Sequence, residues 1–277
     1  MTMVASHLPK ARVAGFTDFA RSTLYYSRRL EPVHRPRSDE SKVREQIRRV
    51  ALAHPTFGVR RVWAVMRREG HLINRKRAYR LMREEHLVRE AHFPRPRKPS
   101  TGRLIAEQPN QVWSTDFTDI LTTDHGVCHL MTIVDACTRE VLAWEFLPNF
   151  GAREALMVVE QAVMREFPQT CRAEGVVLKT DCGSHFTARI FREGARAQGL
   201  ELEMSRPHTP EDNGLQESFH GHFKADYLWP REAESYLETR VTLRTALQDY
   251  GSNRPHSSLN YRTPEEFARE KKEGTTA

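Results

Sequence analysis

Three carboxylates stand at places in the sequence where their side chains could meet and hold a metal ion. Asp116 lies within a strand-like run at residues 112–120, where an unpaired charge would be costly to bury. Asp181 directly follows a short apolar run at residues 176–180 and precedes a glycine turn, and Glu217 lies in a helical segment. Converging carboxylates without a His or Cys partner suit hard ions such as Mg²⁺ or Mn²⁺ rather than zinc. A pair of such ions can activate an attacking oxygen and stabilise a leaving oxygen in displacement at a phosphodiester.

Other acidic residues compete for the first of these positions, and the residues alone leave that choice open. Asp119, Asp124 and Asp135 all lie near Asp116. Asp124 and Asp135 fall at turns, and Asp119 should point to the opposite face of the strand because side chains alternate along a strand.

The helix that carries Glu217 also presents a lysine. At about 100° per residue, Glu217 and Lys224 share one face of this helix. The opposite face carries an apolar stripe of Leu215, Phe219, Phe223 and Tyr227. We expect the stripe to pack on the core, and Glu217 and Lys224 to face a cleft that could hold an anionic substrate beside a metal.

The elements that must position these residues follow from the periodicity of the apolar side chains. Strands are expected at residues 111–121, 128–135, 140–147, 176–180 and 201–205, and helices at 153–167, 188–199 and from about 212. The order βββαβαβα is typical of an α/β fold in which helices cover the faces of a mixed sheet.

Three helical segments precede the strands, at residues 40–53, 59–69 and 75–85. The second and third are joined by a short turn that begins at Gly70, and Asn74 is a suitable N-cap for the third. This arrangement favours an all-α helix-turn-helix domain ahead of the sheet.

The third helix opens with a basic run, and in a helix-turn-helix the first residues of the second helix reach base edges. The residues expected to contact DNA there are Asn74, Arg75, Lys76, Arg77 and Arg80. Arg60 and Arg61, near the start of the preceding helix, are expected to contribute. A plain helical hairpin with a solvated basic face is the alternative. Upstream, residues 18–27 are either the end of another small DNA-binding unit or a packing helix.

Charge is divided unevenly along the 277 residues, whose net charge is +7. Residues 1–110 carry 25 Lys and Arg against 10 Asp and Glu, whereas residues 111–277 carry 18 against 26. Basic blocks of this density usually contact phosphate, because each neutralised phosphate releases counterions. The alternative for the basic block is again a solvated helical face. The carboxylates of residues 111–277 could lie on the surface, cap helices or bind metal.

The composition excludes several classes of protein. With 39% hydrophobic residues the chain has enough apolar surface for a core, which argues against wholesale disorder. No apolar run approaches the roughly 18 residues of a membrane span, and residues 1–15 lack the apolar segment of a signal peptide, so we expect a cytoplasmic protein. The four cysteines form no CxxC pair, which argues against a disulfide framework or a structural zinc site. We expect reduced, mostly buried thiols.

Several ordered motifs make a family resemblance specific. They are Phe57-Gly-Val-Arg-Arg-Val-Trp, Trp113-Ser-Thr-Asp-Phe-Thr, Thr180-Asp-Cys-Gly-Ser, Asp212-Asn-Gly-Leu-Gln-Glu-Ser-Phe with Lys224, and the tail from Asn253-Arg-Pro-His. Thirty-five residues separate the second aspartate from the glutamate. These motifs cover most of residues 40–267 and resemble the OrfB product of two-frame insertion sequences, whose DDE catalytic core is shared with retroviral integrases and has an RNase H-like fold.

The resemblance implies a DNA transposase that cleaves element ends and joins the 3′-hydroxyl ends to DNA by metal-dependent transesterification. It implies Asp116, Asp181 and Glu217 as ligands of Mg²⁺ or Mn²⁺, with two ions per site, and Lys224 as a contact to the transposon-end DNA. It also implies an OrfA product as fusion or complex partner, a homo-oligomer in the synaptic complex, and association with the bacterial nucleoid. Lys179 and the pair His185-Phe186 depart from the family pattern, in which His and Gln-Tyr are common.

With the resemblance, the chain divides into four parts. We expect a helical DNA-binding region at 1–93, with the helix-turn-helix at about 40–90, and a basic proline-rich linker at 94–110. The integrase-like core is expected at 111–230, and a C-terminal helical segment and tail at 231–277. Two other functions stay open: a DNA-binding protein that only occupies or regulates element ends, and an RNase H-type nuclease for RNA–DNA hybrids. The intact triad argues against the first, and the basic front part and the tail argue against the second.

Overall fold

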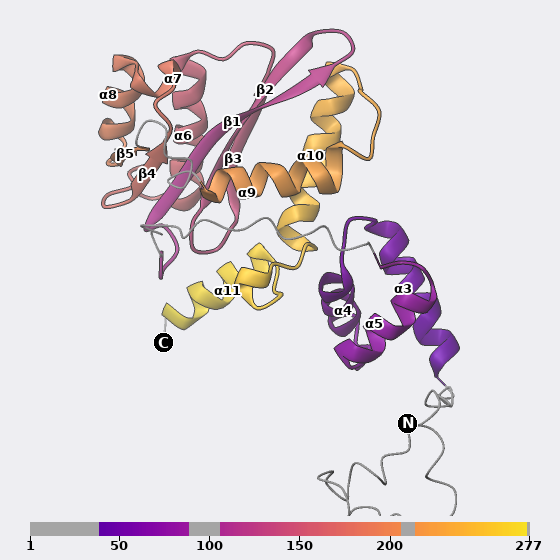
Figure 1. The fold of residues 1–277 in the computed structure, drawn as a ribbon. Helices are drawn as coiled ribbons and strands as arrows, with labels where there is room; N and C mark the ends of the chain where they lie inside the picture. The colour runs from indigo at the N-terminus through magenta and orange to yellow at the C-terminus, as the bar shows by residue number, and fades with distance from the viewer. Residues whose placement is uncertain (1–38, 89–105, 206–213, 276–277) are drawn as a thin grey trace, which may run out of the picture. The chain divides into compact units, whose positions relative to one another are not determined.

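The computed structural model describes residues 39–88, 106–205 and 214–275. The upstream segment at 18–27 and most of the linker expected at 94–110 lie outside these ranges. Figure 1 labels the helices and strands along the chain.

Three helices form the first described part of the chain: α3 (Glu40–Ala53), α4 (Val59–Arg68) and α5 (Arg75–Glu84). The sequence predicted each of them to within one residue. Apolar side chains from all three helices form a shared core, in which Ile47, Val62 and Leu81 are fully buried. Gly70, with φ +87°, follows α4 in the left-handed conformation that glycine tolerates best. The Asn74 side chain caps α5 by accepting a 2.9 Å hydrogen bond from the Lys76 amide.

A five-stranded mixed sheet forms the centre of the second described part. Its strands are β1 (Val112–Thr122), β2 (Gly126–Asp135), β3 (Val141–Leu147), β4 (Val177–Thr180) and β5 (Glu201–Met204), in the order β3-β2-β1-β4-β5. The first three strands pair antiparallel, whereas β4 and β5 pair parallel on the other side of β1. The predicted order of elements is therefore confirmed, and β1 lies at the junction of the antiparallel and parallel halves.

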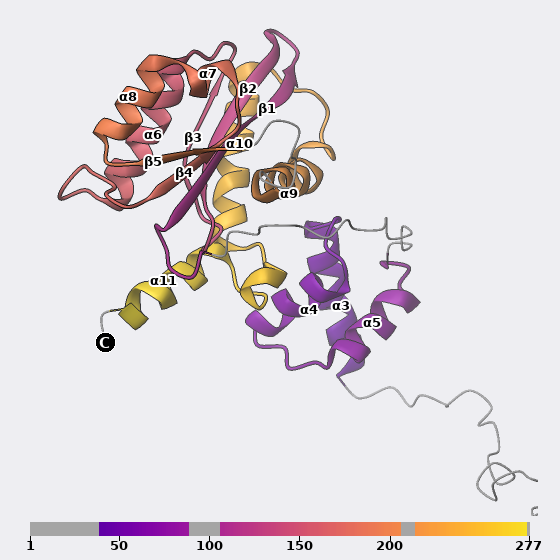
Figure 2. The same ribbon diagram turned by 60° about the vertical axis from the view of Figure 1, so that its left-hand side comes forward.

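Helices cover both faces of this sheet (Figure 2). The first face is covered by α6 (Ala152–Glu166), α7 (Ser184–Thr187) and α8 (Arg189–Ala197). The second face is covered by α9 (Gly214–Phe223) and α10 (Tyr236–Ser252). Side chains alternate along β1, so Trp113 packs on the α6 face and Ile120 on the α9 face. The remaining elements are η2 (Lys224–Leu228), η3 (Ser257–Leu259) and α11 (Pro264–Thr275).

Helix α9 departs from the predicted apolar stripe. Its buried residues are Gln216, Phe219, His220 and Phe223. The prediction was right for the two phenylalanines but wrong for Leu215, which is only half-buried because the packed face is rotated toward Gln216. Tyr227 packs against the same core as Phe223, as expected, although it lies beyond α9 in the π-helical turn η2, where the spacing of 100° per residue no longer applies.

Two further expectations can be compared with the described residues. Cys128 and Cys137 are buried, but Cys171 and Cys182 are exposed, so the expectation of mostly buried thiols was wrong for half of them. Both exposed cysteines lie in turns outside the regular elements. No helix within residues 39–88, 106–205 and 214–275 is long and apolar enough to cross a membrane.

Candidate active site and DNA-binding helix

Asp116 lies on β1, and Asp181 directly follows β4, the strand that pairs parallel with β1. Ser114 on β1 is the register partner of Lys179 on β4, and the two aspartates each lie two residues further along. Adjacent strands are about 4.8 Å apart, and register partners point to the same face. Leu178, the neighbour of Lys179 on β4, packs on the α6 face. Because side chains alternate along a strand, Lys179 and Asp181 point to the other face, which α9 covers. Asp181 thus lies at the carboxyl end of β4, the kind of edge where α/β sheets bind ligands, and Asp116 lies at the corresponding level of β1.

Local hydrogen bonds orient both side chains. Asp181 Oδ1 accepts from the Gly183 amide at 2.9 Å, in the turn that ends β4. Asp116 Oδ1 accepts from the Phe117 amide at 2.8 Å. Both residues are half-buried, so each carboxylate keeps access to solvent and to a substrate.

Glu217 is exposed in the first turn of α9, the helix that covers the same sheet face as Asp116. The donor set of the three residues consists of carboxylate oxygens, which fits a hard divalent ion. Within the described residues, however, no three His, Cys, Asp or Glu side chains are grouped closely enough to hold one. The structure thus places the two aspartates together, and Glu217 on the adjoining helix.

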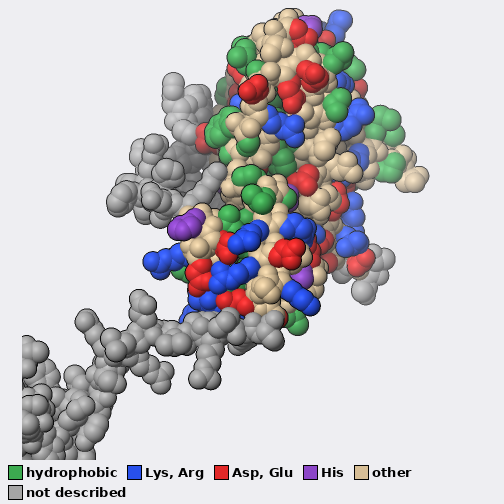
Figure 3. Space-filling model, turned by 90° about the vertical axis from the view of Figure 1, so that its right-hand side faces the viewer, with side chains coloured by type: hydrophobic (Ala, Val, Ile, Leu, Met, Phe, Trp, Pro, Cys, Tyr) green, Lys and Arg blue, Asp and Glu red, His purple; other side chains and the backbone are tan. Residues whose placement is uncertain are grey.

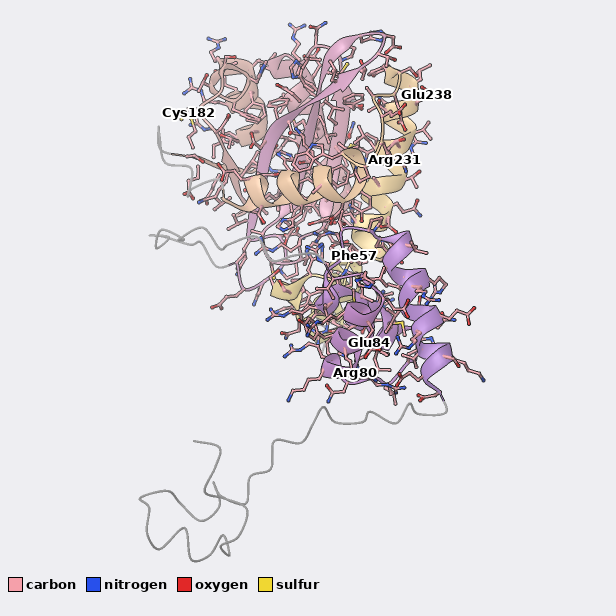
Figure 4. All side chains as sticks on the ribbon, turned by 45° about the vertical axis from the view of Figure 1, so that its right-hand side comes forward. Phe57, Arg80, Glu84, Cys182, Arg231 and Glu238 are labelled. Carbon is pink, nitrogen blue, oxygen red and sulfur yellow. The ribbon has the colours of Figure 1, made fainter. Side chains whose placement is uncertain are left out.

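Lys224 begins the π-helical turn after α9, and its Nζ donates a 2.8 Å hydrogen bond to the Asp119 carbonyl. Burial lowers the pKa of Lys224, and the Asp119 carboxylate opposes this shift. The side chain lines a pocket of about 330 Å³ together with Trp229 and Arg231. Trp229 is 70% exposed at this pocket, and Arg231 is labelled in Figure 4.

The three competing aspartates have other roles. Asp119 points to the face opposite Asp116, as expected, where it pairs with His129 at 2.7 Å. Asp124 accepts from the Tyr236 amide at 2.8 Å, a hydrogen bond that lowers its pKa. Asp135 is the buried last residue of β2, directly before a turn, and accepts from three backbone amides; burial raises its pKa. The expected positions of Asp119 on the opposite face and of Asp124 in a turn are confirmed, whereas the expectation of a turn was wrong for Asp135, which ends strand β2.

The residues that depart from the family pattern have structural partners. Lys179 forms a 3.1 Å ion pair with Glu203 on β5. Phe186 is fully buried, and the His185 ring lies 5.1 Å from the Phe117 ring. These contacts lie immediately around Asp181 and support the turn that carries it.

Sequence reasoning missed three buried polar residues behind the candidate site. Gln216 and Thr132 are fully buried and His220 is nearly so, and all three lie between α9 and the sheet. The i, i+4 spacing of Gln216 and His220 around Phe219 was the available signal, because these three residues define one continuous helix face.

In α5, the expected DNA contacts differ in exposure. Arg75 and Lys76 are exposed, whereas Arg77 is half-buried. Arg80 donates to Glu84 at 3.0 Å, and both are labelled in Figure 4. The Asn74 side chain is already used as the helix cap. The most accessible part of the basic face is therefore at the first turn of α5.

The two expected arginines of α4 also differ. Arg60 is exposed. Arg61 is half-buried, with its guanidinium 5.4 Å from the centre of the Phe57 ring and 3.4 Å from the Asp226 carboxylate. An arginine held by these two partners is less available to DNA than Arg60.

Acidic residues neutralise part of the positive charge of the three-helix part. Figure 3 shows Lys and Arg side chains interspersed with Asp and Glu on the face that it displays. Arg44 and Arg48 of α3 bind Glu85, and Arg44 also binds Glu84. These hydrogen bonds lower the pKa of both glutamates. The number of basic residues in the sequence therefore overstates how many are available to phosphate.

Comparison with known proteins agrees with this architecture. Residues 38–96 match the family described as HTH-like domain, and residues 106–210 and 198–264 match families described as Integrase core domain. The chain is 33% identical over 242 residues to transposase InsD for insertion element IS2A/D/F/H/I/K of Escherichia coli, covering 84% of this chain and 80% of that protein. Identity and coverage are the same for transposase InsD for insertion element IS2 on the F plasmid of Escherichia coli K12.

A solved structure supports the fold. The chain is similar to a chain of the simian T-cell lymphotropic virus intasome, determined by cryo-electron microscopy with the PP2A regulatory subunit B56 gamma. The TM-score is 0.51 at 16% identity, covering 80% of this chain and 74% of that chain. The architecture is thus the RNase H-like fold of integrase cores. By its sequence and its fold, the chain belongs to the insertion-element transposases of the OrfB type, which are DDE polynucleotidyl transferases.

Proposed function

We propose that Asp116, Asp181 and Glu217 form the metal site with which this transposase cleaves and joins DNA. The observation that supports the proposal is the register of β1 and β4. It places Asp116 and Asp181 at equivalent positions, each two residues beyond the paired Ser114 and Lys179, on the face that α9 covers. Glu217 in the first turn of α9 supplies the third carboxylate. The proposed cofactor is Mg²⁺ or Mn²⁺, with two ions per site.

Two such ions, when bound, activate an attacking oxygen and stabilise the leaving oxygen of a phosphodiester. The half-buried Asp116 and Asp181 hold their carboxylates in fixed orientations through backbone amides, so these ligands need little reorganisation on binding. Attack by water first frees a 3′-hydroxyl at the element end, and this hydroxyl then attacks a second DNA strand. No covalent bond between protein and DNA is needed in either step.

The DNA contacts proposed for the chain are of two kinds. The exposed basic first turn of α5, with Arg75 and Lys76, would bind the terminal repeats, and Arg60 would contact phosphate nearby. Lys224, beside the pocket with Trp229, would contact the DNA end. An ammonium on the helical turn that follows the helix of Glu217 would offset part of the negative charge that the triad presents to DNA.

The remaining proposals concern assembly and location. A single chain offers one candidate metal site, whereas joining two element ends to a target requires two, so we propose a homo-oligomer in the synaptic complex. The OrfA product is the proposed fusion or complex partner, and the cytoplasmic nucleoid is the proposed location.

The experiment is metal-dependent cleavage of duplex DNA that carries the element ends, with OrfA product added if the wild type requires it. Asp116→Asn and Glu217→Gln keep the size of each side chain and remove its charge. We expect both variants to lose cleavage and joining while their DNA affinity stays within about threefold of wild type, because phosphate contacts dominate affinity. Asp124→Asn, in the turn between β1 and β2, is the matched control and should retain cleavage, because its carboxylate caps the Tyr236 amide.

Retained cleavage in either triad variant would refute the assignment. DNA binding without any Mg²⁺-dependent nicking by the wild type would favour the regulatory alternative, and cleavage of RNA–DNA hybrids in preference to element ends would favour the nuclease. The joint variant Arg75→Gln/Lys76→Gln tests the DNA surface separately. It should reduce the slope of log affinity against log salt by about 1 for each phosphate that the variant no longer neutralises.

A further inference from the structure

The buried face of α9 contains two polar side chains where a packed helix normally presents apolar ones. Gln216 is 0% exposed and His220 is 7% exposed, on the same face as Phe219 and Phe223. Burying an amide without hydrogen bonds costs roughly 1–3 kcal/mol. A buried glutamine next to the candidate metal ligand Glu217 therefore needs partners, and it has them on two strands.

The Gln216 amide joins α9 to both β1 and β2. Its Nε2 donates to the Ser114 carbonyl on β1, and the Thr132 carbonyl on β2 lies 3.4 Å from it. The Thr132 hydroxyl donates back to Gln216 Oε1 at 3.3 Å. Both ends of the amide are thus hydrogen-bonded to the sheet.

His220, one turn further along α9, extends this network. Its Nε2 lies 3.3 Å from the Thr132 hydroxyl. Burial and the charge of Lys224 lower the pKa of His220 to about 4, so the ring is neutral near pH 7. A proton on Nε2 allows the ring to donate to Thr132, whose hydroxyl then donates to Gln216. The three side chains form one directional chain of hydrogen bonds.

The strand positions that Gln216 binds are the ones beside Asp116. Ser114 lies two residues before Asp116 on the same face of β1, and Thr132 is the register partner of Asp116 across the antiparallel pair. The residue directly before Glu217 is therefore fastened to the two sheet positions that adjoin Asp116. The contacts of Phe219 and Phe223 are non-directional, whereas hydrogen bonds restrict both the rotation and the sliding of the helix.

We propose that Gln216 is a positioning residue which, with Thr132 and His220, sets the distance between Glu217 and Asp116 and thereby the affinity of the site for its metal. This inference rests on the proposed roles of Asp116 and Glu217. Gln216 itself touches neither metal nor DNA in this proposal, because its amide is directed into the sheet. Loss of residues that orient metal ligands typically lowers metal affinity by about 10–100-fold.

The test compares variants that differ in hydrogen bonding but little in size. Gln216→Met removes both ends of the amide, Thr132→Val removes the hydroxyl with nearly the same shape, and Thr132→Ser keeps the hydroxyl. Phe219→Leu alters packing on the same face, including the contact with the His220 ring, but removes no hydrogen bond of the network. Each full-length variant is titrated with Mn²⁺ without DNA, following the metal-dependent rise in Tm, and then assayed for Mg²⁺ dependence of cleavage.

We expect Gln216→Met and Thr132→Val to need about tenfold more metal in both measurements, with a smaller change in rate at saturating metal. Thr132→Ser should restore the wild-type requirement. Phe219→Leu should lower Tm and leave the metal requirement unchanged. Wild-type metal requirements in both Gln216→Met and Thr132→Val, or an equal shift in Phe219→Leu, would overturn the proposal.

Two features keep the outcome interpretable. If Gln216→Met does not fold, the comparison of Thr132→Val with Thr132→Ser decides alone. Failure of the underlying assignment is distinguishable, because Asp116→Asn and Glu217→Gln would then retain both cleavage and Mn²⁺ stabilisation. If those variants lose both while Gln216→Met and Thr132→Val behave as wild type, the metal site stands and only the positioning role is refuted.

Discussion

Replacing Gly183 by alanine is expected to impair catalysis while leaving the fold nearly intact, because the added methyl group would press on the Asp181 carboxylate. A Cβ atom at this position would lie 2.9 Å from Asp181 Oδ1 and 3.4 Å from Oδ2. The backbone itself accepts alanine, since Gly183 has φ −60° and ψ 153°. The substitution therefore acts on a candidate metal ligand and not on the turn.

The size of the effect follows from these distances. An ordinary van der Waals contact between a Cβ atom and another heavy atom begins near 3.4 Å, so Asp181 Oδ1 must move by about 0.5 Å. Catalytic groups must lie within about 0.5 Å of their productive positions, so this displacement uses all of that tolerance. A misplacement of about 1 Å costs on the order of 100-fold in rate, so we expect a loss of about tenfold. The 2.9 Å hydrogen bond from the Gly183 amide would weaken, at a cost of about 1 kcal/mol in the free energy of unfolding.

The assay is the rate of Mg²⁺-dependent cleavage of element-end DNA, with Tm measured on the same preparation. Ser184→Ala is the neighbouring control, because it changes the next residue, which is exposed at the start of α7, without adding an atom. A wild-type rate and metal requirement in Gly183→Ala would refute the reasoning that the Asp181 position limits catalysis. A loss of stability much above 1 kcal/mol would show instead that the turn cannot accept the methyl group.

Two further predictions concern stability. Asp226→Asn should lower the free energy of unfolding by about 3–5 kcal/mol in urea titrations, because its 2.7 Å ion pair with Arg254 is about 95% buried and the arginine would lose its counter-charge. Glu193→Gln, in an exposed pair, should cost under about 1 kcal/mol; equal losses would contradict the burial argument. The pKa of His220 is lowered to about 4 in the folded chain, so the unfolded chain binds a proton at this residue more readily than the folded chain does. The contribution of His220 to the free energy of unfolding is therefore complete above pH 6.5, and about 3 kcal/mol of it is lost as the pH falls to 4. In His220→Gln, the free energy of unfolding should therefore fall less steeply between pH 6.5 and 4. Part of the fall should remain, because burial also lowers the pKa of His256. An unchanged dependence of the free energy of unfolding on pH would show that His220 titrates normally.

Much of the fold could be predicted because its signals are local. The helices at 40–53 and 75–85 show apolar spacing of three and four, and Asn74 and Gly70 mark a start and an end by backbone chemistry alone. The strand at 112–122 shows a change to extended periodicity. Local signals also identified the candidate carboxylates, since a charge within a strand and a charge before a glycine turn are unusual wherever the chain folds.

The limits of the sequence appear where a residue's surroundings come from distant segments. Nothing near Arg61 indicates that Asp226 will pair with it, and nothing near Cys182 indicates that it will be exposed. The predicted apolar stripe of α9 included Leu215 and omitted Gln216 and His220, because both of these buried residues are polar. A helical pattern predicts which side chains are buried from their hydrophobicity alone. It therefore fails for a polar side chain that is buried because its hydrogen-bond partners lie on distant segments.

Spacing along the chain was enough to establish which elements form, which family the chain resembles and which carboxylates are candidates. Which of those carboxylates lie together depends on the folded chain. Asp116 and Asp181 become neighbours through the parallel pairing of β1 with β4, an alignment set by packing across a crossover of many residues. Gln216, the residue before Glu217, is hydrogen-bonded to β1 and β2, so the seat of α9 on the sheet also depends on the folded chain. Such bonds join residues far apart in sequence, so no local pattern could reveal them.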